Sequence, residues 1–211
     1  MAESTERTGS TQTTQITLGV GTRCSDGPCG TVIRVVVDPV ARTVTHVVVE
    51  PKHREGFGRL VPLDLVEARA DEVTLGCTTE QFEKLEMAEE TTFLPNDPSY
   101  LASGEVYTVP LLGVGTPNVP PPITTDVLPL GEVGVRRNEQ VHATDGEIGR
   151  VRGVLIEHDT RRVTHVLLQE GHLWGRKQVA IPIGAVTGIE HGIRLDMTKQ
   201  EVQDLPAVHV G

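Results

Sequence analysis

Two histidines occupy matching places in two similar stretches of the chain, and they are the first candidates for chemistry. His46 stands in Val44-Thr45-His46-Val47, and His165 stands in Val163-Thr164-His165-Val166. A two-fold arrangement could bring the two imidazoles together around a metal ion. Because no Cys or carboxylate accompanies either histidine at ligand spacing, we favour strand histidines that hydrogen-bond to the backbone or to threonine. The metal site is the alternative.

The three cysteines are the next candidates, because Cys24 and Cys29 flank an Asp-Gly turn at a spacing that suggests redox chemistry or zinc binding. The chain repeats itself, and the residues that correspond to Cys24, Cys29 and Cys77 in the second copy are Ala143, Ile148 and Met197. Positions that accept plain apolar groups are typical of buried free thiols. We therefore expect no functional cysteine.

The sequence offers no pattern for catalysis or for cofactor binding. The G-x-G stretches at residues 19–21 and 113–115 lack a third glycine that opens a helix after a strand, so they are read as turns. Asp64, a carboxylate that could do acid–base work, is replaced by Gly184 in the second copy. We expect no catalytic residue, no cofactor and no enzymatic activity.

Two loop aromatics are the candidates for contact with a partner. Phe57 and Trp174 each lie near glycine in equivalent loops, and Trp is enriched among the residues that dominate binding energy. Trp174 ranks first, because it is the one tryptophan and Gly175-Arg176-Lys177 follows it in an acidic chain. The alternative is that each ring folds back over its own unit. We predict that Phe57, Trp174, Arg176 and Lys177 contact another protein.

An internal repeat supplies the elements that would position these residues. Asp145-Gly146 repeats Asp26-Gly27 at a shift of 119 residues, as the two histidines do. A one-residue insertion then raises the shift to 120, after which Ile181-Pro182-Ile183 repeats Val61-Pro62-Leu63. The chain therefore reads as two similar units.

Each unit reads as a series of short strands that ends in one short helix. Val-rich runs separated by turn residues are typical of strands. In the first unit the expected strands span residues 32–37, 43–50, 60–63 and 73–75, with a turn at 25–28. Thr78 with Gln81, and Thr198 with Glu201, have the spacing of a capping box, which predicts the start of a helix in each unit.

The strands are apolar on both faces, which is not typical of a half-exposed strand. Val35 and Val37 are expected to point to one face, and Val32 and Val36 to the other. Something besides the interior of the unit must cover the second face. We expect the other copy to do so, packed about a pseudo-two-fold axis like the contact of a homodimer.

The composition limits the class of partner. The net charge of −10 argues against DNA and RNA, since nucleic-acid affinity depends on Lys and Arg that neutralise phosphates. The aromatic content of 3% leaves Val, Leu and Ile to fill the core. No apolar run is long enough to span a bilayer, and an odd number of cysteines fits a reducing compartment. We therefore expect a soluble, cytoplasmic protein.

The domain boundaries follow from the repeat and from the prolines. Polar residues dominate the stretch 1–15, which predicts a disordered tail. The two units are expected at 16–90 and 133–207, joined by a stiff, Pro-rich connector at 91–132. Residues 208–211 form a short second tail.

Three motifs carry a family resemblance. They are Asp-Gly-x-x-Gly-x-Val at 26–32 and 145–151, Val-Thr-His at 44–46 and 163–165, and (Val/Ile)-Pro-(Leu/Ile) at 61–63 and 181–183. This pattern resembles the PRC-barrel family, small β-barrels named for a subunit of the photosynthetic reaction centre and also found in a ribosome maturation factor. The resemblance implies small β-barrels. With the repeat, the helix caps and the apolar strand faces, it leads us to expect an all-β fold of two barrels in tandem, each ending in a short helix and packed as an intrachain pseudo-dimer. In that family the barrel generally docks proteins.

The sequence thus favours a non-enzymatic scaffold or adaptor for another protein. One alternative is a ligand or metal carrier that uses His46 and His165 at the pseudo-two-fold interface. A second alternative, an accessory role in RNA processing or ribosome maturation, depends on analogy between folds alone. A homo-oligomer is left open.

Overall fold

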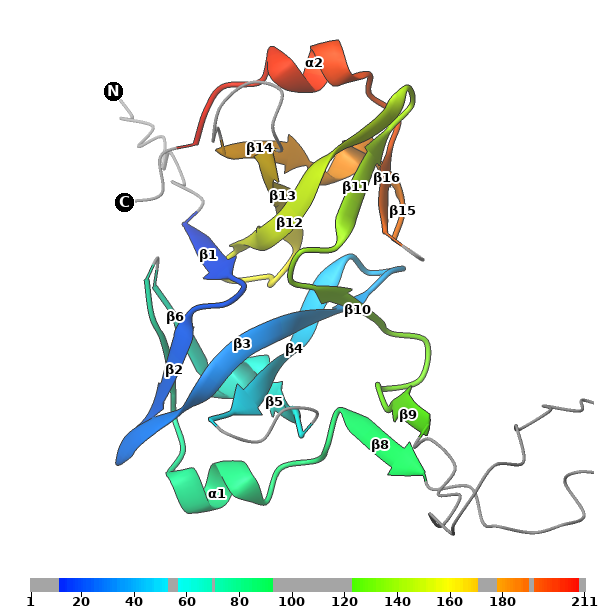
Figure 1. The fold of residues 1–211 in the computed structure, drawn as a ribbon. Coiled ribbons are helices and arrows are strands. Elements are labelled where there is room, and N and C mark those ends of the chain that lie inside the picture. Colours follow the sequence, from blue (N-terminus) through cyan, green and yellow to red (C-terminus); the bar gives the residue numbers. More distant parts are fainter. Residues whose placement is uncertain are drawn as a thin grey trace, which may run out of the picture.

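The protein is described by a computed structural model that covers residues 12–52, 57–69, 71–92, 123–170, 178–189 and 192–208. Most of these residues lie in strands, which form two similar, strongly curled sheets stacked end to end (Figure 1). The expected all-β fold with two barrel-like units and short helices is confirmed.

The first sheet has the strand order β5-β4-β3-β2-β7-β6. Its strands are β2 (Gly21–Cys24), β3 (Gly27–Asp38), β4 (Thr43–Pro51), β5 (Arg59–Pro62), β6 (Val66–Ala68) and β7 (Val73–Leu75). A 3₁₀ turn, η1 (Leu63–Leu65), joins β5 to β6. The sequence pattern gave β4 and β7 closely but missed the short strand β6.

The second sheet repeats this order as β14-β13-β12-β11-β16-β15. Its strands are β11 (Gln140–Ala143), β12 (Gly146–Glu157), β13 (Val163–Glu170), β14 (Gln178–Pro182), β15 (Val186–Gly188) and β16 (Ile193–Leu195). The turn η3 (Ile183–Ala185) takes the place of η1. The two units therefore share one topology as well as a sequence pattern.

A short helix closes each unit, as the capping boxes predict. In α1 (Thr79–Glu83) the hydroxyl of Thr78 accepts a hydrogen bond from the amide of Gln81, whose side chain in turn accepts from the amide of Thr78. Thr198 and Glu201 form the same reciprocal pair at α2 (Lys199–Gln203). Such caps satisfy amide groups that the first helical turn leaves unpaired.

The two units exchange their first strands. Strand β1 (Thr13–Thr17) precedes the first sheet in sequence but pairs with β12 of the second, with Ile16 opposite Val154. Strand β10 (Val133–Arg136) precedes the second sheet but pairs with β3 of the first, with Val135 opposite Val35. Each sheet is thus completed by a strand from the other unit (Figure 1).

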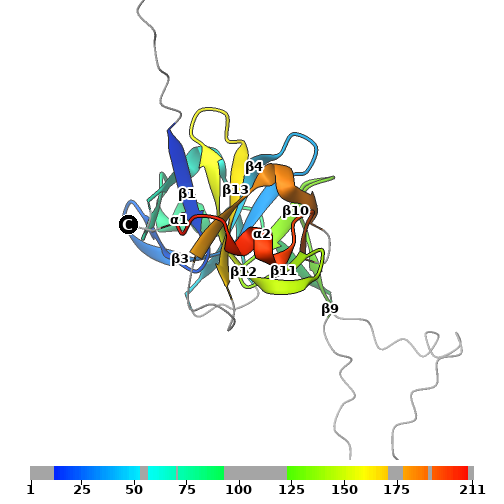
Figure 2. The same cartoon turned by 90° about the horizontal axis from the view of Figure 1, so that it is seen from above.

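The β3–β4 and β12–β13 hairpins meet at the pseudo-two-fold axis. Thr43 forms an isolated β-bridge with Arg162, the residue that corresponds to Thr43 in the second unit. The amide of Val44 donates to the carbonyl of Arg161 at 3.0 Å, and the amide of Val163 donates to the carbonyl of Arg42 at 2.8 Å. Figure 2 shows the two hairpin loops side by side. The expected intrachain pseudo-dimer is therefore present.

The interiors of the two units form one continuous apolar core, which includes Val35 of the first unit and Val154 of the second. The expected alternation along β3 is wrong at Val32, because a β-bulge between Val32 and Arg34 places Val32 in this core together with Val35 and Val37. Two Val-rich units therefore bury their interiors against each other.

The outer face of the first sheet has a different cover from the one expected. Val36 does face away from the shared core, but it packs with Val48, Leu60 and Ala88, and Leu128 packs against this cluster. Ala88 follows α1 and Leu128 precedes β10. The expectation that the other copy covers this face is wrong, because the segments on either side of the connector, with Ala88 and Leu128, cover it instead.

The boundaries drawn from the sequence differ from the structure at two places. Strand β1 begins at Thr13, inside the tail expected at 1–15, because its backbone completes the second sheet. The connector expected at 91–132 contains β9 (Ile123–Asp126), which pairs with β8 (Glu89–Thr92) as a separate two-stranded ribbon. Neither helix in the described ranges is long and apolar enough to cross a membrane.

Candidate functional site

The structure separates the two candidate histidines. His46 lies opposite Val36 and Pro62, and His165 lies opposite Leu155 and Pro182, so each stands on the outer face of its own sheet.

Each ring is held by the threonine that precedes it. The Nδ1 atom of His46 lies 3.0 Å from the hydroxyl of Thr45, and that of His165 lies 3.1 Å from the hydroxyl of Thr164. Glu132 approaches His46 Nδ1 at 3.8 Å. Within the described ranges, no group of three or more His, Cys, Asp or Glu side chains is arranged to hold a metal ion. The described residues therefore offer no ligand set that would support the metal-carrier alternative.

The three cysteines are buried free thiols in the core of the first unit. Cys29 contacts the buried hydroxyl of Thr22 at 3.6 Å. Burial is the main cause that raises the pKa of Cys24 and that of Cys77 above their ordinary values. A protonated thiol is a poor nucleophile, so this environment supports the structural role expected from the sequence.

Phe57 is on the surface, where the residue is 53% exposed. The segment that begins at Phe57 pairs with the chain after α1, because Arg59 bridges Met87. Residues opposite each other, and residues two apart, share a face of such a pair, so Phe57 and the 42%-exposed Met87 lie on one outward face. We call these two side chains the Phe57 surface.

A rigid support lies under the Phe57 surface. The amide of Ala88 donates to the carbonyl of Gly58 at 2.8 Å, and the fully buried Ala88 packs on Val48 and Leu60. A Cβ atom at Gly58 would lie 2.6 Å from Cγ1 of Val48, so only glycine lets the strand approach the sheet this closely. The exposed pair is therefore held by a packed second layer.

The remaining predicted contact residues, Trp174, Arg176 and Lys177, lie outside the described residues. Their role stays a prediction.

A buried arginine, which the sequence reasoning missed, fixes the β8–β9 ribbon to the first sheet. The side chain of Arg34 is 1% exposed, and its Nη2 donates to Oε1 of Glu89 at 2.9 Å. Its Nη1 lies 3.1 Å from Oδ1 of Asp126, which also pairs with Arg136 at 2.6 Å. Burial acts to raise the pKa of Asp126, but the hydrogen bond from Arg136 and the charge of Arg34 outweigh it and lower that pKa. The ribbon is thus held by a charge network.

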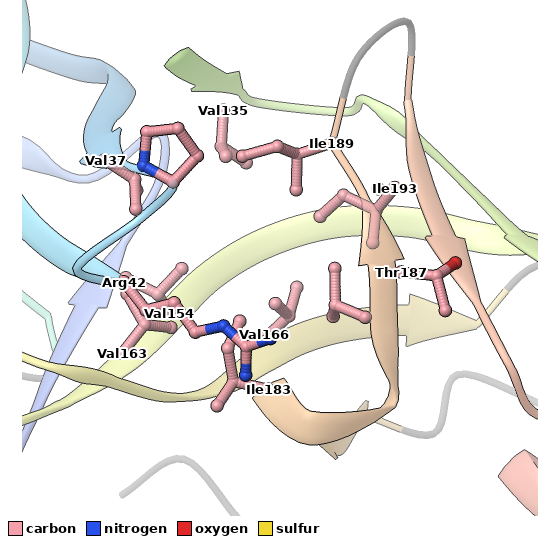
Figure 3. A pocket seen from close by; sticks show the side chains of 13 residues that line it. Val37, Arg42, Val135, Val154, Val163, Val166, Ile183, Thr187, Ile189 and Ile193 are labelled. Atoms are coloured by element: carbon pink, nitrogen blue, oxygen red, sulfur yellow. The ribbon is translucent and has the colours of Figure 1, made fainter. Parts of the chain in front are cut away.

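A second feature missed from the sequence is a cavity of about 180 Å³ between the two units (Figure 3). Its walls are mostly apolar, with Val154, Val166, Ile183 and Ile189 from the second unit and Val37 from the β3–β4 hairpin of the first. We call it the interface cavity.

Arg42 also lines the interface cavity, as the one cationic side chain among the described residues around it. In Figure 3 its guanidinium extends from the hairpin toward Val166 and Ile183. The sequence did show that arginine recurs at this position as Arg161, but not that the hairpin carries it over an apolar space. The cavity can accept an apolar group and an anionic group together.

Comparison with known families finds a match for the second unit. Residues 137–202 match the PRC-barrel domain, and this range contains the strands β11 to β16 and most of α2. No curated protein matched the chain in sequence.

Proposed function

Because residues 137–202 form a PRC-barrel domain, and a second sheet of the same topology precedes it, we propose that this protein is a non-enzymatic scaffold that binds another protein. The observation that carries the proposal is the Phe57 surface, where a large aromatic side chain and Met87 are exposed on a rigid, packed support. Action in the cytoplasm, as expected from the sequence, is part of the proposal.

Exposed apolar side chains on a pre-organised surface are the usual basis of a binding hot spot. Aromatic residues and Met are enriched at the centres of interfaces, where they lose contact with water. A fixed backbone lowers the entropy lost on binding. The pairing of Arg59 with Met87 and the packing of Ala88 provide that fixed backbone here.

Charge around the Phe57 surface indicates the chemistry of the partner. Arg59, opposite Met87, donates from Nη1 to the carbonyl of Leu85 at 2.9 Å, whereas Glu83 and Glu86, which precede Met87, are exposed, and the whole chain carries a net charge of −10. Complementary charge steers association and selects partners more than it adds affinity. We therefore expect a partner segment with an apolar side chain for the Phe57 surface and basic residues beside it.

The proposal is tested by capture with the full-length chain from its native host, comparing the wild type with Phe57→Ser and Met87→Ser. The captured protein is identified, purified and titrated against each variant. We expect each substitution to weaken binding about tenfold or more, as hot-spot truncations do. Val40→Ser is the matched control, because Val40 is 93% exposed but lies on the β3–β4 hairpin, away from this surface.

The interaction is also expected to weaken with added salt, since the basic residues of the partner would face Glu83 and Glu86. If the same partner bound the Phe57→Ser and Met87→Ser variants as tightly as the wild type, the Phe57 surface would not be its site. Trp174→Ala then tests the remaining predicted contact.

A further inference from the structure

The interface cavity has a counterpart in the other unit, and the two differ in charge. The counterpart lies between the β12–β13 hairpin and the first unit, and its lining includes Asp64, Glu67, Arg69, His158 and Arg161. Thr187, Ile189, Pro39 and Arg42 line the interface cavity at the corresponding places, and Gly184, the counterpart of Asp64, follows the lining residue Ile183. Four ionisable side chains are thus replaced by uncharged residues, while the arginine is kept.

Of the two corresponding arginines, Arg161 forms an ion pair and Arg42 forms none with the described residues. In the counterpart pocket Arg161 forms an ion pair with Asp64. Gly184 stands at the place of Asp64 and supplies no carboxylate to Arg42. The ion pairs and side-chain hydrogen bonds formed within the described part of the chain include none from the guanidinium of Arg42.

The backbone of Arg42 is fixed, so its position over the interface cavity is set by the fold. Its amide donates to the carbonyl of Asp38, and its carbonyl accepts from the amide of Val163, both at 2.8 Å. The carboxylate of Asp38, at the end of β3, accepts from the amides of Val40 and Ala41. It therefore stabilises the turn, and no side chain of the described residues provides a counter-charge for the cation that faces this apolar cavity.

We propose that the interface cavity binds a small carboxylate with an apolar body, whose carboxylate pairs with Arg42 and whose body contacts Val154, Val166, Ile183 and Ile189. Arg and carboxylate form paired, charge-assisted hydrogen bonds that are stronger than neutral ones. The volume of about 180 Å³ suits a single ring, since an apolar protein cavity of about 150 Å³ accepts benzene. This site is distinct from the Phe57 surface and does not depend on the protein-binding function.

Benzoate and its neutral analogue benzamide are the probes for this site. Each is titrated into the full-length protein while the methyl signals of Val154, Val166 and Ile183 are followed by NMR. We expect benzoate to bind about tenfold more tightly than benzamide, as is typical when a hydrogen bond involves a charged group. The methyl signals report whether the ring enters the cavity.

Two substitutions test the role of the Arg42 charge while leaving the apolar walls of the cavity unchanged. Arg42→Gln removes the cation, and Gly184→Asp supplies the internal carboxylate that the counterpart pocket has. A Cβ atom at Gly184 meets nothing within 4 Å, and the side chain of Arg42 is exposed, so both variants are expected to fold. Each should reduce the affinity for benzoate about tenfold and leave that for benzamide unchanged. Arg161→Gln in the counterpart pocket is the matched control and should change neither affinity.

The proposal is supported if the preference for benzoate is present in the wild type and lost in both variants. It is overturned if benzoate and benzamide shift the methyl signals equally, or if the preference persists in Arg42→Gln. Unchanged methyl signals in the wild type at the solubility limit of benzoate also overturn it.

Discussion

Replacing Arg34 by Met is expected to destabilise the protein by about 3 kcal/mol, because it leaves the carboxylate of Glu89 buried without its cation. The two side chains are 1% and 10% exposed, so water can solvate neither well. Asp126 adds less to the cost, since it is partly exposed and keeps its ion pair with Arg136. The free energy of unfolding is measured in urea by circular dichroism.

The double variant Arg34→Met/Glu89→Met tests the cause of that loss. Replacing a buried ion pair by apolar side chains of similar size is often neutral or stabilising, so the double variant should recover to within about 1 kcal/mol of the wild type. Arg136→Met, which removes an exposed ion pair, is the control and should cost less than about 1 kcal/mol. A loss below about 1 kcal/mol for Arg34→Met alone, or a double variant no more stable than the single one, would refute the reasoning.

Three further outcomes follow from contacts described above. Gly134→Ala should lower the free energy of unfolding by about 1–3 kcal/mol, because the added Cβ would lie 2.4 Å from Cδ of Arg34. Thermal unfolding measures this loss, and an unchanged melting temperature would contradict it. The pKa of Asp126 is lowered by folding, so its charge stabilises the protein above the unfolded pKa of about 4 and this contribution is lost as the pH falls through the folded value. Asp126→Asn should accordingly be less stable than the wild type at neutral pH and equally stable in acid, and a gap that persists in acid would rule out the linkage. Because burial raises the pKa of Cys24 and Cys77, iodoacetamide should label neither in the folded protein at mildly alkaline pH and both after unfolding, as mass spectrometry would show.

The elements that the sequence predicted well are those set by local chemistry. The capping boxes at Thr78 and Thr198 fix where the helices begin, whatever lies around them. The repeat of Val, Thr and His predicted β4 and its counterpart β13 in the second unit, and the turn near Asp26 predicted the first hairpin. In each case a few neighbouring residues decide the backbone conformation.

The features that the sequence did not predict depend on contacts between distant residues. The pattern around Ile16 suits the edge of either sheet, so its pairing with Val154 could not be read from β1 alone. The burial of Arg34 depends on the bulge beside it and on the acidic ribbon that covers it, which comes from distant parts of the chain. The change from Asp64 to Gly184 was visible, yet its meaning depends on the hairpin that carries Arg42.

The exchanged strands matter for any attempt to dissect this protein. A fragment that starts at residue 133 would retain β10, which has no place in its own sheet, and would lack β1, which completes that sheet at β12. Shortening the N-terminus past Thr13 would accordingly damage the matched PRC-barrel domain, more than a hundred residues away, before it affected the neighbouring sheet. Truncation effects on this chain should therefore be interpreted by sheet membership and not by distance along the sequence.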